Sequence, residues 1–349
     1  MMPKLTAARL DIDLAALLAN YRTLQTVAPA SEIAPVVKAD AYGLGMARIA
    51  PWLAKHGAQT FFVARLQEGI ALRKILSEVV IYVLDGLGAG ELTLFAEHDL
   101  RPVVNSVEQV DRLDGSKVLA ALHIDTGMNR LGIRPEEVQG LPGDFKPVMI
   151  ISHLACGDEL GHPLNAQQLE AFKAIVQRFP GVPASFANSA GAFLGSEYQF
   201  DLIRPGNSLY GGGPFGIAHP DIKPVAHLRA PVLQVRDLKA GETVGYGATF
   251  TASRDMRLAT VGLGYADGLL RSFAASGFAT VQEARRPLTG RISMDVFSLD
   301  VTGLEVATGD WVEVLGAQQN LDEVATASGT IGYEWLTRLG ARLQRHYTT

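Results

Sequence analysis

The sequence predicts an α/β fold, a TIM-like (β/α)8 barrel over residues 10–225, followed by a mainly β C-terminal domain over 226–349 that also includes residues 1–9. Three observations support this prediction. Eight short apolar runs alternate with amphipathic segments, the pattern changes near residue 225, and polar residues stand where most runs end. Because parallel strands need long crossover connections, repeated alternation of strand and helix favours a parallel barrel.

The eight predicted strands are short and rich in apolar or β-branched residues. They are PVVKA at 35, FFVA at 61, VVIYVL at 79, RPVVN at 101, VLAALHID at 118, VMIISHL at 148, ASFANS at 184 and LIRPGN at 202. Between them, segments such as QEGIALRKIL and NAQQLEAFKAIVQRF place apolar residues three and four positions apart. That spacing indicates amphipathic helices.

The sequence after the barrel indicates antiparallel strands. Alternating segments broken by glycine, such as LATVGLGYADG and DWVEVLG, are typical of a small β domain. Pro, Gly and His interrupt any periodicity in PFGIAHPDIKPVAH, which we expect to link the two domains. The last segment, IGYEWLTRLGARLQRHY, is expected to form a closing helix.

Composition and charge exclude several classes of function. The chain has 349 residues, 48% of them hydrophobic and 19% charged, as in ordinary globular proteins. Its net charge of −5, without a basic cluster, argues against nucleic acid as a ligand. The only cysteine, Cys156, cannot form an intramolecular disulfide or a multi-cysteine metal site, and no apolar run is long enough to span a bilayer. We expect a cytoplasmic protein that binds neither a metal nor a membrane.

Polar residues gather at the predicted carboxyl ends of the strands, where barrel enzymes hold their reactive groups. They are Lys38, Asp85, Asn105, Asp125, His153, Asn188, Ser189 and Arg204. Lys38 stands between an apolar run and the turn ADAYGLG. One interpretation is a surface lysine whose amine extends into water. The other is an amine whose pKa an apolar wall lowers, which makes it a nucleophile toward aldehydes and a proton carrier.

The loops after the last two predicted strands indicate a phosphate site. ANSAG offers the Ser189 hydroxyl, and RPGNSLYGGG offers backbone N–H groups near Gly206 and Asn207. A reactive lysine beside a phosphate pocket suggests pyridoxal phosphate as the cofactor. The sequence lacks the GxGxxG and GxxxxGK[ST] fingerprints in their required contexts, which disfavours Rossmann and P-loop sites.

These motifs resemble those of the alanine racemase family, barrel-type (fold type III) enzymes that depend on pyridoxal phosphate. VVKADAYGLG resembles the cofactor-lysine motif of the family, DTGMNRLG its substrate-arginine motif, and ANSAG with RPGNSLYG its phosphate and pyridine segments. GYADG, GRISMD and GYEWLT resemble its C-terminal signatures. The resemblance covers nearly the whole chain, with the motifs in the family's order.

The resemblance implies a homodimeric isomerase with shared active sites that interconverts L- and D-alanine, either supplying D-alanine for cell-wall peptidoglycan or degrading it. It implies two catalytic residues, Lys38 on one face of the substrate and Tyr265 of the neighbouring subunit on the other. The implied cofactor-binding residues are Lys38, Tyr42, His153, Asn188, Ser189, Arg204, Gly206, Asn207 and Tyr333. The implied substrate-binding residues are Arg130, Met294 and Asp295.

The roles implied for individual residues follow their chemistry. Arg204 is expected to face the pyridine nitrogen, where a guanidinium that keeps its proton leaves the ring a weaker electron sink. Arg130 is expected to hold the substrate carboxylate in a fork. His153 is expected to connect Tyr265 to Arg204, although on its own it is more typical of a core histidine. Met294 and Asp295 are expected to narrow the active site of the partner around a small side chain.

Three positions depart from the family pattern, and three alternative functions stay open. Ser293 replaces a frequent cysteine, which we expect to matter little, and Asn207 replaces a usual aliphatic residue, which is tolerable if only its backbone N–H contacts phosphate. His123 stands seven residues before Arg130, where many members carry a lysine that becomes carbamylated and orients the arginine. We therefore expect no carbamylated lysine and another acceptor for Arg130. The alternatives are a racemase of serine or of a broader set of amino acids, a decarboxylase of the same architecture, which GYADG and Arg204 disfavour, and a noncatalytic cofactor carrier, which the β domain disfavours.

Overall fold

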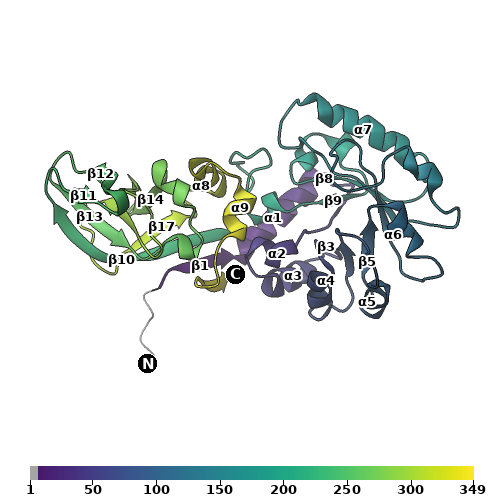
Figure 1. The fold of residues 1–349 in the computed structure, drawn as a ribbon, viewed down its shortest axis with the longest axis horizontal. Helices are drawn as coiled ribbons and strands as arrows, with labels where there is room; N and C mark the ends of the chain where they lie inside the picture. Colours follow the sequence, from purple (N-terminus) through teal and green to yellow (C-terminus); the bar gives the residue numbers. More distant parts are fainter. Residues whose placement is uncertain (1–6) are drawn as a thin grey trace. The chain divides into compact units, whose positions relative to one another are not determined.

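A computed structural model of the chain describes residues 7–349. It divides into two compact units (Figure 1). The barrel unit comprises Leu18–Leu209, and the β unit comprises residues 7–17 and Tyr210–Thr349. The predicted contribution of residues 1–6 to the β domain lies outside the described residues, and the boundaries at 10–225 and 226–349 stay a prediction.

The barrel unit contains an eight-stranded parallel sheet in the order β2-β9-β8-β7-β6-β5-β4-β3, which confirms the predicted barrel. Its strands are β2 (Glu32–Ile33), β3 (Thr60–Val63), β4 (Val80–Val83), β5 (Arg101–Val104), β6 (Ala121–His123), β7 (Met149–Ile151), β8 (Ala184–Asn188) and β9 (Leu202–Arg204). β2 ends before the predicted first strand PVVKA begins, and Lys38 of that segment already belongs to α2, so the first strand was misplaced. Pro35 has no N–H to continue a regular ladder. The segment beyond β2 still closes the barrel, since Val37 N–H donates to Phe62 O at 2.9 Å and Phe62 N–H donates to Pro35 O at 3.0 Å.

Helices surround these strands. They are α1 (Leu14–Val27), α2 (Lys38–Tyr42), α3 (Met46–Lys55), α4 (Leu66–Arg73), α5 (Leu92–Glu97), α6 (Val107–Asp111) and α7 (Pro163–Val176). Figure 1 shows α7 on one side of the barrel strands and α3 to α5 on the other. The helices predicted from three-and-four spacing are confirmed as α4 and α7. Phe172 of α7 stacks on Phe186 of β8 with ring centroids 4.9 Å apart, so the apolar face of this helix covers the sheet.

The β unit is built on a mainly antiparallel sheet, as predicted. Strands β15-β14-β17-β10-β1-β18 lie in this order, and β13 pairs with both β10 and β16. Their bounds are β1 (Arg9–Asp13), β10 (Ala226–Leu238), β13 (Met256–Val261), β14 (Phe278–Val281), β15 (Ala284–Pro287), β16 (Phe297–Asp300), β17 (Trp311–Leu315) and β18 (Gln344–Thr348). β11 (Thr243–Val244) and β12 (Phe250–Thr251) form a separate hairpin.

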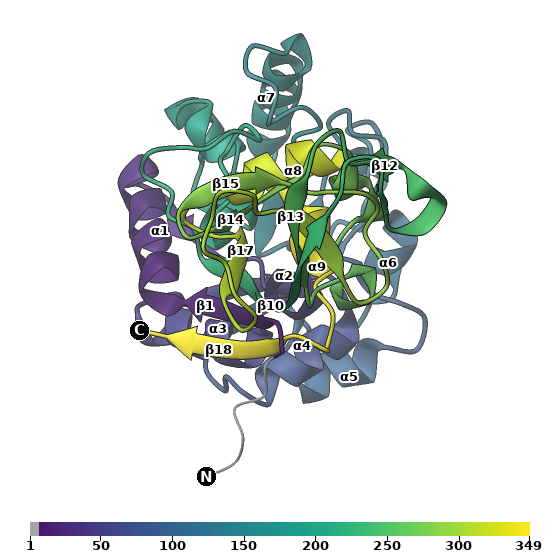
Figure 2. The ribbon, with the colours of Figure 1, turned by 90° about the vertical axis from the view of Figure 1, so that its left-hand side faces the viewer.

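The end of the chain differs from the predicted closing helix. Helices α8 (Leu321–Ser328) and α9 (Gly332–Thr337) are followed by β18, which pairs with β1 in parallel register (Figure 2). The helix prediction was therefore wrong for the last residues. Exposed and half-buried side chains alternate along β18, and the open edge of β1 supplies the backbone partners that a strand needs. Among residues 7–349, no helix combines the length and apolarity that crossing a bilayer requires.

Candidate active site

Lys38 immediately follows the segment that closes the barrel and is the first residue of α2. The next four residues, Ala39–Tyr42, have φ values of 51°, 55°, 53° and 57°, all in the left-handed region. Each such non-glycine residue costs roughly 1–2 kcal/mol. Gly43 and Gly45 continue with φ of 80° and 99°, which explains the glycines of the motif. The left-handed turn thus reverses the chain directly after the lysine.

The Lys38 amine lies in a strongly perturbed environment. Burial is the main cause that lowers its pKa, and the guanidinium of Arg130 adds to the effect. The carboxylates of Glu68 and Asp85 act in the opposite direction. Its amine makes no hydrogen bond or ion pair with any of residues 7–349. A lowered pKa leaves more free amine at neutral pH, as a nucleophile and proton carrier requires.

An anion cradle forms where the loops after β8 and β9 meet. Ser189 Oγ accepts the backbone N–H groups of Gly206 at 3.0 Å and Ser208 at 3.1 Å, and both of these hydrogen bonds are buried. A Cβ at position 206 would lie 2.2 Å from Tyr42 Oη, so any residue larger than glycine would displace the Tyr42 ring. The structure therefore brings Tyr42, Ser189 and Gly206 together, and Asn207 begins the 3₁₀ turn that follows Gly206.

Arg204, the last residue of β9, is buried without an acidic partner among the described residues. Its Nη1 donates to Ser185 Oγ at 2.5 Å and its Nη2 donates to Ser152 O at 2.5 Å. Burial lowers the pKa of Arg204 to about 9, so the group still carries its proton at neutral pH. Its Nη2 also lies 3.4 Å from His153 Nδ1, and burial together with this cation holds the pKa of His153 well below its usual value. The structure thus pairs Arg204 with a neutral His153.

The remaining predicted residue of this rim, Asn188, orders the loop after β8. Its Oδ1 accepts the backbone N–H of Gly191 at 2.9 Å. This contact bends the ANSAG segment into a turn and so holds Ser189 at the cradle.

The loop that carries Arg130 is shaped by the residues around it in the motif. Asp125 Oδ1 accepts three successive backbone N–H groups, those of residues 127–129, at 2.8 to 3.1 Å. A Cβ at Gly132 would lie 2.7 Å from Asp125 N, so the return of the loop needs glycine. Arg130 is exposed, and its guanidinium makes no hydrogen bond or ion pair within residues 7–349. It is free to bind a carboxylate from outside the chain.

His123, which stands where many family members carry a lysine, has a fixed tautomer. Asn105 Nδ2 donates to Leu84 O at 3.0 Å and to Val103 O at 2.8 Å, which assigns its Oδ1 as an acceptor. His123 Nδ1 lies 2.6 Å from that oxygen and therefore donates to it. Burial, followed by the charge of Arg204, lowers the pKa of His123 to about 4. The ring is neutral at physiological pH, with Nε2 as an acceptor.

The other predicted residues belong to the β unit. Three of them, Tyr265, Met294 and Asp295, lie on two segments that pack against each other. Tyr265 N–H donates to Ser293 O at 3.1 Å, and Ala266 N–H donates to Met294 O at 2.9 Å. Gly264 makes this approach feasible, because a Cβ there would lie 2.2 Å from Met294 O. Tyr265 and Met294 are exposed, at 40% and 53%. They form an accessible surface.

Asp295 and Tyr333 complete the predicted set in the β unit. Asp295 Oδ1 is bound by Arg342 Nη1 at 2.8 Å, and Arg342 Nε also pairs with Asp267 at 3.1 Å. One arginine therefore joins the GYADG and RISMD segments. Tyr333 lies in the first turn of α9 and is half-buried.

Sequence reasoning missed two supporting residues of the barrel. Buried Gln168 of α7 donates from Nε2 to His153 O at 2.9 Å and accepts the N–H of Ala155 at 2.8 Å. It thereby holds the segment that carries His153, and its signal was an amide on the apolar face of a helix. Glu68 binds the turn after Lys38, and its only signal was an acid near the start of a predicted helix.

Comparisons with known proteins cover both units. The family models for the alanine racemase N-terminal and C-terminal domains match residues 12–214 and 225–347. An alanine racemase of Rhizobium meliloti (strain 1021) is 44% identical over 369 residues, which are 98% of this chain and 97% of that protein. A protein of Agrobacterium fabrum (strain C58 / ATCC 33970) named "Alanine racemase, catabolic" is also 44% identical, over 98% of this chain and 92% of its own.

Solved structures agree with these relatives. The alanine racemase of Bartonella henselae, described with covalently bound pyridoxal phosphate, matches with a TM-score of 0.93 and 39% identity, over 98% of this chain and 99% of that chain. The biosynthetic alanine racemase of Pseudomonas aeruginosa also has a TM-score of 0.93, at 35% identity, over 99% of this chain and 100% of that chain.

Fold and site together define a barrel enzyme with a perturbed lysine after the first strand segment of its barrel and a separate, mainly β unit. The matches extend over both parts. The chain belongs to the alanine racemase family, a family of isomerases, and the resemblance seen in its motifs is confirmed.

Proposed function

We propose that this chain interconverts L- and D-alanine with pyridoxal phosphate bound at Lys38. One observation carries the proposal: Lys38, the Ser189 cradle and Arg204 all stand at the carboxyl ends of the strands of one barrel. When bound, pyridoxal phosphate supplies an electron sink that makes the Cα–H of an amino acid acidic.

The residues of the barrel unit fit this cofactor. Gly206 and Ser208 direct two backbone N–H groups toward Ser189, and Tyr42 is held against Gly206. Ser208 Oγ is buried without a hydrogen-bond partner among the described residues, so a donor for phosphate remains there. Arg204 has carbonyl and hydroxyl partners but no carboxylate, which suits a neutral pyridine nitrogen better than a protonated one.

The substrate would be handled by side chains of both units. Lys38 holds or accepts the Cα proton on one face because its pKa is lowered. Arg130, with its guanidinium exposed, binds the carboxylate as a fork. Tyr265 of a second copy of the chain serves the opposite face, which one base cannot reach. Met294 and Asp295 of that copy belong to the segment that is hydrogen-bonded to the backbone around Tyr265. They leave room only for a substrate with a small side chain.

The proposed activity is tested by incubating the purified protein with each L-amino acid and separating the enantiomers by chiral chromatography. Alanine should be racemised fastest, whereas faster turnover of serine would favour the broader-specificity alternative. Lys38→Ala should abolish racemisation and the visible absorbance of the cofactor–lysine bond. Lys74→Ala, which changes an exposed lysine at the end of α4, is the control. A Lys38→Ala protein that racemises at the rate of the unaltered protein would end the proposal.

A homodimer with shared active sites is part of the proposal, and its support is the exposure of Tyr265 at 40%. Tyr265→Phe should slow proton abstraction from L-alanine more than it weakens substrate binding. Co-expressing Lys38→Ala and Tyr265→Phe chains tests the sharing directly. If the two residues come from different subunits, mixed dimers regain one intact site, and about a quarter of the normal activity returns. No recovery in verified mixed dimers would place both residues in one chain.

The cellular role is proposed at a coarser level. A cytoplasmic location fits a chain with one cysteine, which gains nothing from an oxidising compartment. Both a biosynthetic and a catabolic enzyme are among the similar proteins, so D-alanine supply for peptidoglycan and D-alanine degradation are equally supported. Deleting the gene separates them, since only a biosynthetic role makes growth depend on added D-alanine.

A further inference from the structure

Glu68 joins two segments of backbone next to Lys38 through three hydrogen bonds. Its Oε1 accepts the N–H of Ala39, the residue that follows the lysine, at 2.7 Å. Its Oε2 accepts the N–H groups of Ala64 at 2.8 Å and Arg65 at 3.0 Å, between the end of β3 and the start of α4. An ionised carboxylate makes such hydrogen bonds stronger than a neutral acceptor does.

The left-handed turn that begins at Ala39 needs support from outside itself. None of its first four residues is glycine, so its backbone geometry is unfavourable for every one of them. The far end of the turn is held by Asp40, whose Oδ1 accepts the N–H of Met46 at 2.8 Å. At the near end, the bond to Glu68 is the long-range contact of Ala39 N–H, 29 residues away in sequence.

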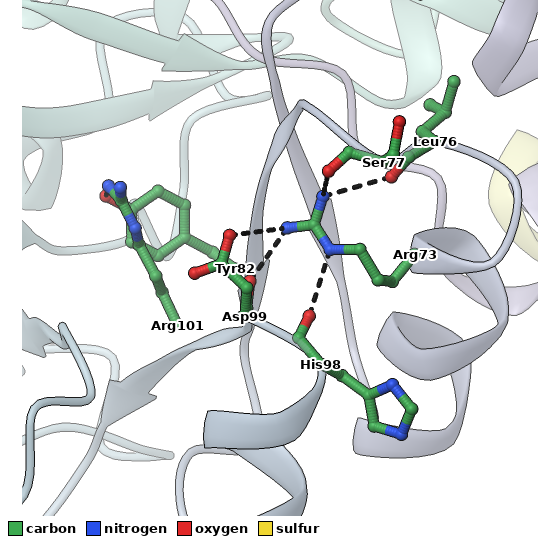
Figure 3. A network of polar contacts seen from close by, with 7 residues as sticks. All are labelled: Arg73, Leu76, Ser77, Tyr82, His98, Asp99 and Arg101. Carbon is green, nitrogen blue, oxygen red and sulfur yellow. Dashed lines mark hydrogen bonds and ion pairs between the residues drawn. The ribbon is translucent and has the colours of Figure 1, made fainter.

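Helix α4 provides a firm support for Glu68. Figure 3 shows the guanidinium of Arg73, at the other end of this helix, enclosed by backbone carbonyls. It donates to Ser77 O at 2.8 Å, His98 O at 3.0 Å and Asp99 O at 2.8 Å. The helix is therefore fixed at its last turn by Arg73, while Glu68 joins its first turn to the turn after Lys38.

We propose that Glu68 is a positioning residue for Lys38, because its carboxylate ties the strained turn after the lysine to β3 and α4 and so fixes the direction of the amine. This inference rests on the proposed function for its catalytic meaning, but the tether itself does not depend on it. Nothing in the motif VVKADAYGLG indicates this partner, which comes from a different strand–helix unit.

The charges around Lys38 give the contact between Glu68 and Ala39, the tether, a second measurable effect, which is on the protonation of the lysine. Arg130 from the loop after β6, Asp85 from the loop after β4, Glu68 from α4 and the neutral His153 after β7 are the titratable groups that act on it or feel its charge. Glu68 and Asp85 raise its pKa, against burial and Arg130. Asp85 is well exposed and lies 3.9 Å from Arg65. Removing the charge of Glu68 should therefore leave Lys38 less protonated at neutral pH.

Two variants of Glu68 and one control separate the contributions. Glu68→Gln keeps the size but loses the charge, and its single carbonyl cannot accept all three N–H groups. Glu68→Asp keeps the charge but is too short to bind both sides. The control is Glu91→Gln, because Glu91 likewise accepts a backbone N–H, that of Gly88 at 2.8 Å, beside a neighbouring helix, and it is not among the charges that shift the pKa of Lys38.

The measurements are hydrogen exchange of the peptide covering residues 38–45 in the full-length protein as purified, and the acetylation rate of Lys38 at pH 7 after cofactor removal. We expect exchange at least about tenfold faster in both Glu68 variants, and several-fold faster acetylation in Glu68→Gln. Glu91→Gln should match the unaltered protein in both. The proposal is wrong if hydrogen exchange does not distinguish both Glu68 variants from Glu91→Gln, or if the acetylation rate does not distinguish Glu68→Gln from it.

The test is independent of the proposed function. If the unaltered protein does not racemise alanine but residues 38–45 and Lys38 respond as expected, the proposed function falls and the tether stands. If the unaltered protein is active but Lys38 does not respond, only the tether falls. A variant that does not fold, as judged by circular dichroism, is replaced by the other Glu68 variant.

Discussion

Single residues decide what this site can hold. Gly206 is the clearest case, because its backbone passes so close to the Tyr42 ring that even a methyl group at this position would push the ring away. His123 shows the opposite situation, in which an unusual residue is accommodated by its surroundings. Asn105 is fixed by two backbone carbonyls and in turn fixes the imidazole, so a neutral ring occupies a position that the family often gives to a modified lysine.

Gly206→Ala should weaken the binding of pyridoxal phosphate at least about tenfold. The added methyl group can be accommodated only if Tyr42 or the cradle moves, and binding groups that are out of place bind their ligand much more weakly. Fluorescence titration of the cofactor-free protein measures this affinity. Gly140→Ala is the control, since a Cβ there meets nothing within 4 Å. Equal affinities for the two variants would contradict the assigned cradle.

Elements were predictable where their pattern is local. The strands from β3 to β9 and the helices α4 and α7 follow from apolar runs and three-and-four spacing. The left-handed turn does not, because Ala39, Asp40 and Ala41 have no common preference for positive φ and the contact with Glu68 is remote in sequence. β18 was missed for the same reason, since its partner β1 lies at the other end of the chain.

Of the candidate site, the residue types at the strand ends could be predicted, but not their neighbours. Lys38 and Arg204 stand where strand-end reasoning put them. The shifts in their pKa values depend on burial and on charges from other loops, which no motif encodes. Ser185, which binds Arg204, lies inside β8 and looks like any small strand residue in the sequence.

Ala39→Gly should stabilise the barrel by about 0.5–1 kcal/mol, because glycine relieves roughly 1–2 kcal/mol of left-handed strain and costs roughly 0.5–1 kcal/mol of extra chain entropy. The N–H that binds Glu68 is retained. Ala71→Gly is the matched control: Ala71 is also exposed but lies inside the right-handed helix α4, where glycine costs about 1 kcal/mol. Urea unfolding should shift in opposite directions for the two variants, and shifts of the same sign would contradict the assigned strain.

At the scale of the whole molecule, the buried imidazoles make the free energy of unfolding fall in acid. His123 has a pKa of about 4 in the fold, below the usual 6.5, and the pKa of His153 is lowered well below that value too. Groups with a depressed pKa stay neutral in the fold while the unfolded chain takes up protons. Proton uptake by the unfolded chain therefore lowers the free energy of unfolding as the pH falls from 6.5 toward 4.

The unfolding free energy should thus decline steadily between pH 6.5 and pH 4, with His123 alone accounting for about 3 kcal/mol of the loss. His123→Gln removes this titration while keeping a donor for Asn105, so its stability should depend less steeply on pH. Urea midpoints measured at pH 7, 5.5 and 4.5 test this. Parallel pH dependences for the two proteins would show that His123 is protonated normally in the fold.

The joint of the barrel wall and the reactive lysine occupy one short stretch of chain. The parallel bridge between Val36 and Phe62 is where the cylinder shuts, two residues before Lys38. Any parting of the wall at this joint would separate the lysine from β3 and α4, whereas the bond from Val36 N–H to Pro205 O at 2.9 Å would still hold its segment beside β9. The bond from Ala39 N–H to Glu68 crosses the same joint, so one carboxylate serves both to keep the cylinder shut and to hold the chain beside the reactive amine.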